Sequence, residues 1–266
     1  MHAATLHRFP ATSRPFARPL ARVPAMPALE RPNAVHELDL AGIQELVSTR
    51  RRVKGGEHIY HAGDSFASIY VVRSGFFRSN MTLVDGREQV TSFFMAGEIM
   101  GMDGIHRGEH TCDMIALEDS EVCVIAYARL QRLSADMPAL QQHFHRMMGR
   151  EITRDHGIML LLGSMRAEER LATFLLQLSA RYAARGYSAT AFNLRMTRED
   201  IGSYLGLKIE TVSRALGKLQ KQGLVSVKGR RIEIDDLAAL RGVVGGKDDG
   251  FAAPAERRAP VVAMCA

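Results

Sequence analysis

Residues 197–222 read TREDIGSYLGLKIETVSRALGKLQKQ, and this stretch decides the fold of the C-terminal part of the chain. Thr197 is followed three positions later by the acidic Asp200, a variant of the capping box that begins a helix. Gly206 supplies a tight turn, and a second helix is predicted over 209–222. Two helices joined by a short turn that contains glycine form a helix-turn-helix, which predicts DNA binding.

The second of these helices has one apolar and one polar face. Its inner stripe consists of Ile209, Val212, Leu216 and Leu219. The opposite face carries Glu210, Ser213, Arg214, Gly217, Lys218 and Lys221, with Thr211 at the flank. Arg pairs with guanine through two hydrogen bonds, Glu accepts from cytosine, and Lys reaches phosphate. The polar face is therefore suited to the edges of bases.

A small hairpin with a basic turn is predicted after Gly223, with strands over 224–227 and 232–234. Such a hairpin is the wing of a winged helix. Residues 195–231 hold nine Lys or Arg and three Asp or Glu, a difference of +6 that equals the net charge of the chain. A solvated basic surface would also explain this charge, but motif, wing and charge together favour DNA. The predicted DNA contacts are Thr197, Lys208, Glu210, Thr211, Ser213, Arg214, Lys218, Lys228 and Arg230.

Short strands separated by turns are predicted from Glu37 to about Tyr127. The strands are expected over 68–72, 76–83, 90–94 and 121–125, and a short helix over 39–50 is expected to precede them. Turn signals recur at Gly55-Gly56, Gly63-Asp64, Ser74-Gly75, Asp85-Gly86, Gly97-Glu98 and Arg107-Gly108. This even spacing predicts a compact antiparallel barrel or roll.

A long helix is predicted over 139–162, with Pro138 at its first turn. One narrow apolar stripe runs along it through Leu140, Phe144, Met148, Ile152, Met159 and Leu162. The stripe suits a coiled-coil seam between two copies of the chain. The alternative is a helix packed against its own domain. A second amphipathic helix follows over 167–184, with Leu171, Phe174, Leu175 and Leu178 on one face.

Asp155 lies three residues after Ile152 and four before Met159, on the predicted seam. In a two-fold dimer it would meet its own copy, and two like charges repel when they lose water. We expect this repulsion to keep the dimer weak. The alternative is a wet point of the seam at which Asp155 matters little.

The composition narrows the class of protein. The 266 residues suit two domains, and the chain lacks the apolar run that a membrane span requires. The sparse cysteines, Cys112, Cys123 and Cys265, are typical of a reducing cytoplasm. Neither a Gly-rich phosphate loop, a zinc motif nor a nucleophile elbow is present, so we expect neither an enzyme nor a metal site. Residues 1–34, which are rich in Pro and Arg, and residues 245–266 are expected to be disordered.

Several motifs make the chain resemble the CRP/FNR superfamily of bacterial regulators, and the FNR branch in particular. They are Gly63-Asp64, Ile69-Tyr-Val-Val-Arg-Ser-Gly75, Glu88-Gln89-Val90, Ala96-Gly-Glu98, Ala167-Glu-Glu-Arg-Leu-Ala172, Thr197-Arg-Glu-Asp-Ile-Gly-Ser-Tyr-Leu-Gly206 and Glu210-Thr-Val-Ser-Arg214. The resemblance implies an α+β fold: an antiparallel β-roll over 35–136 of the cyclic-nucleotide-binding type, a dimerisation helix over 137–163, and a winged helix-turn-helix over 164–244.

The resemblance also implies a homodimeric transcription regulator, an activator, in the cytoplasm. Glu210, Ser213 and Arg214 fall on the motif positions that read a TTGAT half-site in the FNR branch. A two-fold dimer would then bind TTGAT-N4-ATCAA. The turn at Asp85-Gly86 corresponds to one that contacts RNA polymerase, although a plain hairpin turn explains it equally well.

The chain departs from the family in its sensor domain. The FNR branch binds a [4Fe-4S] cluster through four cysteines, and Cys123 sits where the ligand from the roll would be. No cysteine precedes Cys112, however, and three cysteines cannot supply four thiolates. Cyclic AMP is not expected either. The arginine that binds the phosphate in the cyclic-nucleotide branch of the superfamily is absent, and Glu109 and Asp113 would repel an anion. We therefore predict no cofactor, and we expect Cys123 to be a small core residue.

The input to the sensor domain stays open at this point. His106 and His110 near Cys112 could hold haem or a metal, but surface loop histidines are favoured. Cys112 could be a redox thiol, although a lowered pKa would be needed. The alternatives are a regulator gated by a cyclic nucleotide, another small ligand or redox chemistry, and one without a ligand that is controlled by its abundance.

Overall fold

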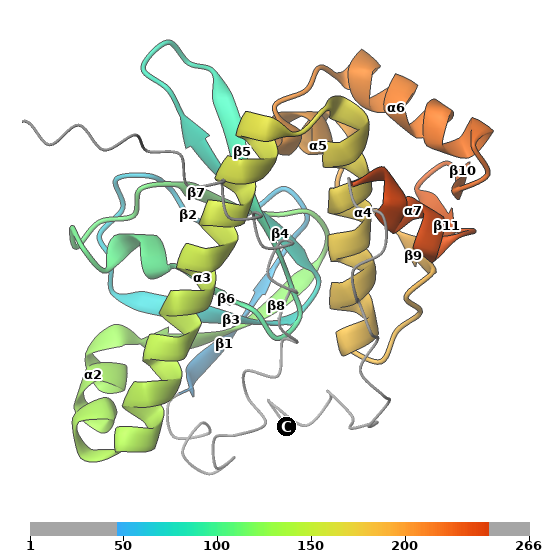
Figure 1. The fold of residues 1–266 in the computed structure, drawn as a ribbon. Coiled ribbons are helices and arrows are strands. Elements are labelled where there is room, and N and C mark those ends of the chain that lie inside the picture. Colours follow the sequence, from blue (N-terminus) through green and yellow to red (C-terminus); the bar gives the residue numbers. More distant parts are fainter. Residues whose placement is uncertain (1–46, 245–266) are drawn as a thin grey trace, which may run out of the picture. The chain divides into compact units, whose positions relative to one another are not determined.

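The computed structural model describes residues 47–244, and these form two antiparallel sheets followed by helices and a small third sheet (Figure 1). The first sheet has the order β1 (Val47–Val53), β8 (Ser120–Ala126), β3 (Ser68–Ser74) and β6 (Ile99–Met100). The second has the order β2 (His58–Tyr60), β7 (Asp113–Ala116), β4 (Phe76–Thr82) and β5 (Glu88–Met95). A short 3-10 turn, η1 (Met102–Gly104), follows β6. These sheets confirm the expected β-roll.

The four predicted strands correspond to β3, β4, β5 and β8. The predicted helix over 39–50 is wrong over 47–50, where β1 forms, and its earlier residues lie outside the described part of the chain. The β-branched Val47, Thr49 and Val53 favour a strand, and β8 offers a partner along the whole of β1. Both predicted disordered ends also lie outside the described residues.

Turn glycines fix the roll where the sequence placed them. Gly75 joins β3 to β4 with a φ of 91°, a left-handed conformation that side chains other than glycine rarely adopt. A Cβ atom at Gly75 would come within 2.0 Å of Ser120 Oγ on β8. This position therefore requires glycine for both its backbone and its neighbour.

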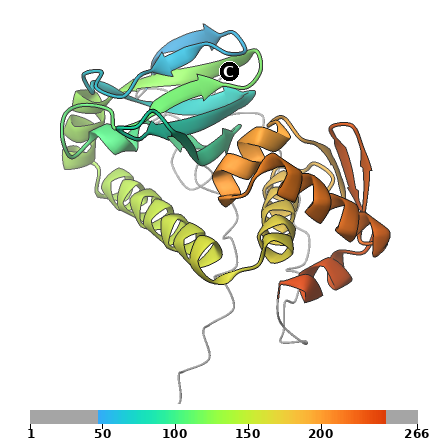
Figure 2. The ribbon, with the colours of Figure 1, turned by 90° about the horizontal axis from the view of Figure 1, so that it is seen from above.

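The long helix α3 (Pro138–Ser164) appears as one uninterrupted rod in Figure 2. It follows α2 (Tyr127–Asp136), which we did not anticipate. Leu140 at its start and Leu161 near its end are buried against their own chain, whereas Ile152 is 56% exposed and Met159 64% exposed. The helix thus packs against its own chain near both ends, and its second half leaves Ile152 and Met159 in solvent.

The C-terminal part begins with α4 (Ala167–Ala184), whose four predicted core residues are all buried. It continues with β9 (Ala191–Asn193), α5 (Arg198–Leu205), α6 (Ile209–Lys221), β10 (Val225–Lys228), β11 (Arg231–Ile234) and α7 (Leu237–Val243). The third sheet has the order β10-β11-β9, so the predicted hairpin gains a third strand that we did not anticipate. Within the described residues, no helix is long and apolar enough to cross a membrane.

Candidate nucleic-acid interface

The first helix of the helix-turn-helix, α5, is fixed by the predicted capping box. Thr197 Oγ1 accepts from the backbone N–H of Asp200 at 3.0 Å, and Asp200 Oδ2 accepts from the N–H of Thr197 at 2.7 Å. Gly206 ends the helix with a φ of 62°. A Cβ atom at Gly202 would lie 2.6 Å from the carbonyl oxygen of Leu207, so the turn into α6 packs closely on α5. This geometry sets the orientation of one helix against the other.

Helix α6 has the two faces that the sequence predicts, with one correction. Val212, Leu216 and Leu219 are buried, but Ile209 is 45% exposed and does not belong to the inner stripe. Ile209 is the first residue of α6, and the core begins one turn later, at Val212. On the outer face Glu210 and Arg214 are exposed.

On the outer face, the hydrogen bonds of Ser213 and Arg214 are long. Arg214 Nη2 lies 3.4 Å from Thr211 Oγ1, and Arg198 Nη1 lies 3.3 Å from Ser213 Oγ. Glu210, Ser213 and Arg214 come from successive turns of one helix, and together they present a carboxylate, a hydroxyl and a guanidinium. This set offers both acceptors and donors to base edges.

Lys218 differs from the other predicted contacts. Its Nζ lies 2.6 Å from Glu168 Oε1 in the first turn of α4, and the side chains of Lys218 and Glu168 are 55% and 36% exposed. An exposed ion pair of this kind is weak, so it does not prevent Lys218 from exchanging its partner for a phosphate. Its predicted role in DNA binding stays a prediction.

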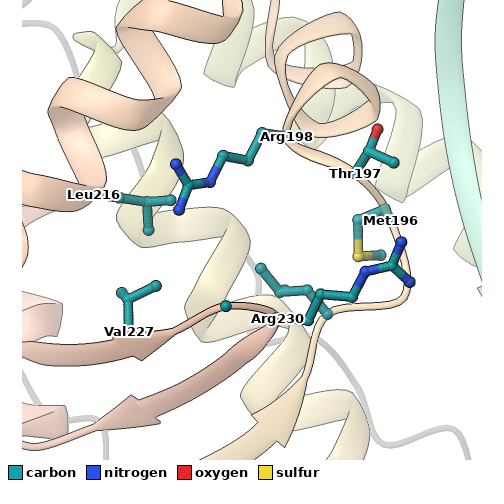
Figure 3. A pocket seen from close by; sticks show the side chains of 8 residues that line it. Met196, Thr197, Arg198, Leu216, Val227 and Arg230 are labelled. Carbon is teal, nitrogen blue, oxygen red and sulfur yellow. The ribbon is translucent and has the colours of Figure 1, made fainter.

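The wing lies next to the start of α5. Strands β10 and β11 pair Lys228 with Arg231, and the turn between them places the exposed Arg230 at its tip. A pocket of about 240 Å³ lies between the wing and the helix-turn-helix, and Figure 3 shows Arg198 and Arg230 on its border. It is lined by Leu194, Met196, Thr197, Arg198, Leu216, Val227, Gly229 and Arg230. Two guanidinium groups from two elements therefore border one depression.

Arg198 was missed by sequence reasoning, although a signal was present. Cations are unfavourable in the first turn of a helix because of the helix dipole, so an arginine there suits a function other than helix stability. Thr197, also exposed, precedes it at the cap. The structure thus adds Arg198 to the basic side chains around the start of α5.

Within the β-roll, a buried polar cluster surrounds Asp103. Its Oδ1 accepts from the Tyr60 hydroxyl at 3.2 Å and lies 3.3 Å from His110 Nδ1. Its Oδ2 accepts from the N–H of Thr111 at 2.8 Å, and the Cys112 thiol donates to it over 3.5 Å. The carboxylate is thus a common acceptor for several neighbouring groups.

The cluster around Asp103 bears on two expectations, that His110 is a surface histidine and that Cys112 could be a redox thiol. His106 is exposed, but His110 is buried, 4% exposed, and stacks on the Tyr60 ring with centroids 3.6 Å apart; it is not a surface histidine. Burial, and then the Asp103 carboxylate, raise the pKa of the Cys112 thiol. A raised pKa disfavours the thiolate, so it argues against Cys112 as a reactive thiol. Among the described residues, no three His, Cys, Asp or Glu side chains are placed to hold a metal ion.

The remaining predicted residues are distributed over the roll. Asp85 and Gly86 lie at the tip of the β4–β5 hairpin, and the Asp85 carboxylate pairs with Arg87 at 2.8 Å. The neighbouring Leu83 and Val84 are exposed large apolar residues, which sequence reasoning did not single out. Cys123 is fully buried in the apolar cluster that also holds Leu130 of α2 and Leu140 of α3.

Two family models match this chain. One is the cyclic nucleotide-binding domain, which matches residues 50–136, and the other is the Crp-like helix-turn-helix domain, which matches residues 169–243. The chain belongs to the CRP/FNR family of transcription regulators. It is therefore a DNA-binding transcription regulator and not an enzyme.

Relatives support this assignment along most of the chain. The transcriptional regulatory protein btr of Bordetella pertussis is 46% identical over 213 residues, which is 80% of this chain and 86% of the relative. The fumarate and nitrate reduction regulatory protein of Escherichia coli is 42% identical over 214 residues, again 80% of this chain and 86% of the relative. The solved structure of FixK2 from Bradyrhizobium japonicum matches with a TM-score of 0.70 at 32% identity, and covers 76% of this chain and all of that one.

Proposed function

We propose that this regulator binds the palindrome TTGAT-N4-ATCAA as a homodimer and reads each half-site with Glu210, Ser213 and Arg214. The observation that carries the proposal is the outer face of α6, where these three side chains lie on one helix beside a basic wing. Because the recognition helix of a helix-turn-helix enters the major groove, these residues would meet base edges. Thr197, Lys228 and Arg230 would contact phosphates around them.

A gel-shift titration tests this proposal. Wild-type protein should bind the palindrome more tightly than a duplex of the same length and composition with both half-sites scrambled. Specific sites typically bind about 10³-fold or more tightly than nonspecific DNA. Equal affinity for the two duplexes would refute the half-site, and would favour a DNA-binding protein that does not discriminate sequence.

The second half of α3 supports the homodimer. Ile152 and Met159 are exposed there, and Asp155, also exposed, lies between them on the same face. Burying these apolar side chains against a second copy would stabilise a dimer, whereas the two Asp155 carboxylates would repel each other. Phe144, Met148 and Leu162 continue the proposed seam on the less exposed parts of the helix.

Sedimentation equilibrium with Asp155→Ala tests the seam. The variant should dimerise more tightly than wild type by about tenfold, because one like-charge pair is removed. Asp136→Ala, which removes the same charge at the end of α2, should leave the equilibrium unchanged. An unchanged equilibrium in Asp155→Ala would show that the side chain does not face its copy.

The β4–β5 hairpin is proposed to contact RNA polymerase. Its tip combines Asp85 and Gly86 with the exposed Leu83 and Val84, and exposed apolar side chains rimmed by charge are typical of protein-binding surfaces. Val84→Ser should therefore lower transcription in a reconstituted assay while the affinity for DNA stays the same. Unchanged transcription would identify the tip as a plain hairpin turn.

We also propose that the regulator acts in the cytoplasm without a [4Fe-4S] cluster or cyclic AMP. The chain has three cysteines, and a four-thiolate cluster needs four. Protein purified without oxygen should be colourless, should contain no stoichiometric iron, and should release no heat with cyclic AMP in calorimetry. A visible absorption band with bound iron, or a saturable heat of binding, would overturn the respective part of this proposal.

A further inference from the structure

An ion pair joins the second sheet of the roll to the helix-turn-helix. Arg78 on β4 donates through Nη1 to Asp200 Oδ1 on α5. The Asp200 side chain is 6% exposed and that of Arg78 25% exposed, so the pair is largely shielded from water. The other oxygen of Asp200 accepts from the N–H and the hydroxyl of Thr197. One carboxylate therefore caps α5 and also receives the guanidinium of the roll.

A second contact lies one turn further along α5. The N–H of Val90 on β5 donates to Ser203 Oγ at 2.8 Å, and the side-chain amide of Gln89 donates to the Ser203 carbonyl. Behind them the rings of Phe93 and Tyr204 lie with centroids 5.2 Å apart. Strands β4 and β5 thus hold α5 at two successive turns, with polar contacts around an aromatic one.

These contacts leave the outer face of α6 open. Asp200 and Tyr204 are buried in the contact with the roll, whereas Glu210 and Arg214 on α6 are exposed. The close turn at Gly202 fixes α6 on α5, so an orientation imposed on α5 is passed to α6. The roll therefore holds the helix-turn-helix without covering the side chains proposed to read DNA.

We propose that Arg78 is a positioning residue for DNA recognition, which acts through Asp200 to hold α5 and α6 in the orientation that binds DNA. The proposal rests on the proposed function, because it assigns to Arg78 no contact with DNA. Arg78 carries a charge that a surface arginine would keep in water, and its Nε is buried without a hydrogen-bond partner. Such an arrangement is costly, and the ion pair with the buried Asp200 compensates for it.

Fluorescence anisotropy with Arg78→Gln tests this inference. The DNA is the palindrome or, if wild type does not bind it, a duplex enriched by wild type from a random pool. The affinity should fall about tenfold, because a shielded charged hydrogen bond is lost. The slope of affinity against salt should stay that of wild type, because no phosphate contact is removed. Arg78→Lys, which keeps the charge, should recover part of the affinity.

Arg73→Gln is the matched control. Arg73 pairs with Glu121 inside the roll, with Nη1 2.6 Å from Oε2. Its substitution by Gln removes the same charge as Arg78→Gln, but at a site that does not contact α5. The affinity of this variant should equal that of wild type. Hydrogen exchange gives a readout that needs no DNA: the amides of residues 197–205 should exchange faster in Arg78→Gln than in Arg73→Gln. If Arg78→Gln does not fold, Ser203→Ala removes the second contact and should have the same effects in smaller measure.

The outcomes separate the two proposals. Failure of wild type to bind the palindrome refutes the half-site, while exchange and affinity for the enriched duplex still test Arg78. Wild-type affinity and wild-type exchange in Arg78→Gln overturn the positioning role. Tighter binding in Arg78→Gln overturns it as well, because the ion pair would then restrain the helix-turn-helix instead of supporting it.

Discussion

The outer face of α6 and the interior of the β-roll use similar polar side chains in opposite ways. On α6, Glu210 and Arg214 are exposed, and the bonds of Ser213 and Arg214 to their neighbours are 3.3–3.4 Å long. In the roll, Asp103 gathers hydrogen bonds from Tyr60, Thr111 and Cys112 in a shielded cluster. Polar groups that bond each other strengthen a fold, whereas polar groups left in solvent are available to a partner. The Asp103 cluster thus stabilises the roll, whereas the outer face of α6 is free to act as the proposed recognition surface.

The largest effect is expected from a substitution that breaks the polar cluster around Asp103 in the roll. Asp103→Ala leaves the buried Tyr60 hydroxyl and its neighbours without their acceptor, and should lower the free energy of unfolding by about 3 kcal/mol. Urea unfolding measures this change. Asp64→Ala is the control, because that carboxylate is 53% exposed, and should cost far less. A recognition role for the cluster would instead appear as a changed sequence preference in Asp103→Ala with normal stability.

The next largest effect is expected from a substitution that removes a side chain from the proposed recognition surface on α6. Arg214→Ala should weaken binding to the palindrome by about 1–3 kcal/mol and relax the preference at its base pair, with no loss of stability. Lys221→Ala, in the last turn of α6, is the matched control and should keep the preference. Competition gel shifts with singly substituted half-sites measure both quantities. An unchanged preference in Arg214→Ala would show that this arginine does not read a base.

Much of the recognition surface could be predicted from the sequence, because its signals are local. Thr197 and Asp200 stand three residues apart, and Gly206 marks the turn by its residue type. The ion pair between Arg78 and Asp200 joins residues 122 positions apart, and no local pattern indicates it. The pairing of strand β9 with β11, across two helices, was not predicted for the same reason. The burial of His110 likewise depends on Tyr60, which comes from a distant strand. Contacts made only by tertiary packing thus escaped prediction.

The smallest effect is expected from a substitution in the wing. Lys228→Ala should weaken binding to specific and scrambled duplexes alike, and should lower the slope of log affinity against log salt by about 1, because one phosphate contact is lost. Lys54→Ala removes the same charge from the roll, where Lys54 is 82% exposed and pairs with Asp119. It should leave the slope unchanged. A slope that falls equally in both variants would assign the effect to net charge and not to the wing.

The proposed palindrome can be tested by selecting duplexes from a random pool with the full-length wild-type protein and sequencing them. We expect enrichment of two TTGAT half-sites in inverted order, separated by four base pairs, because a two-fold dimer presents the outer faces of two α6 helices. Enrichment of a different sequence, of a single half-site without its inverted copy, or of no common sequence would contradict it.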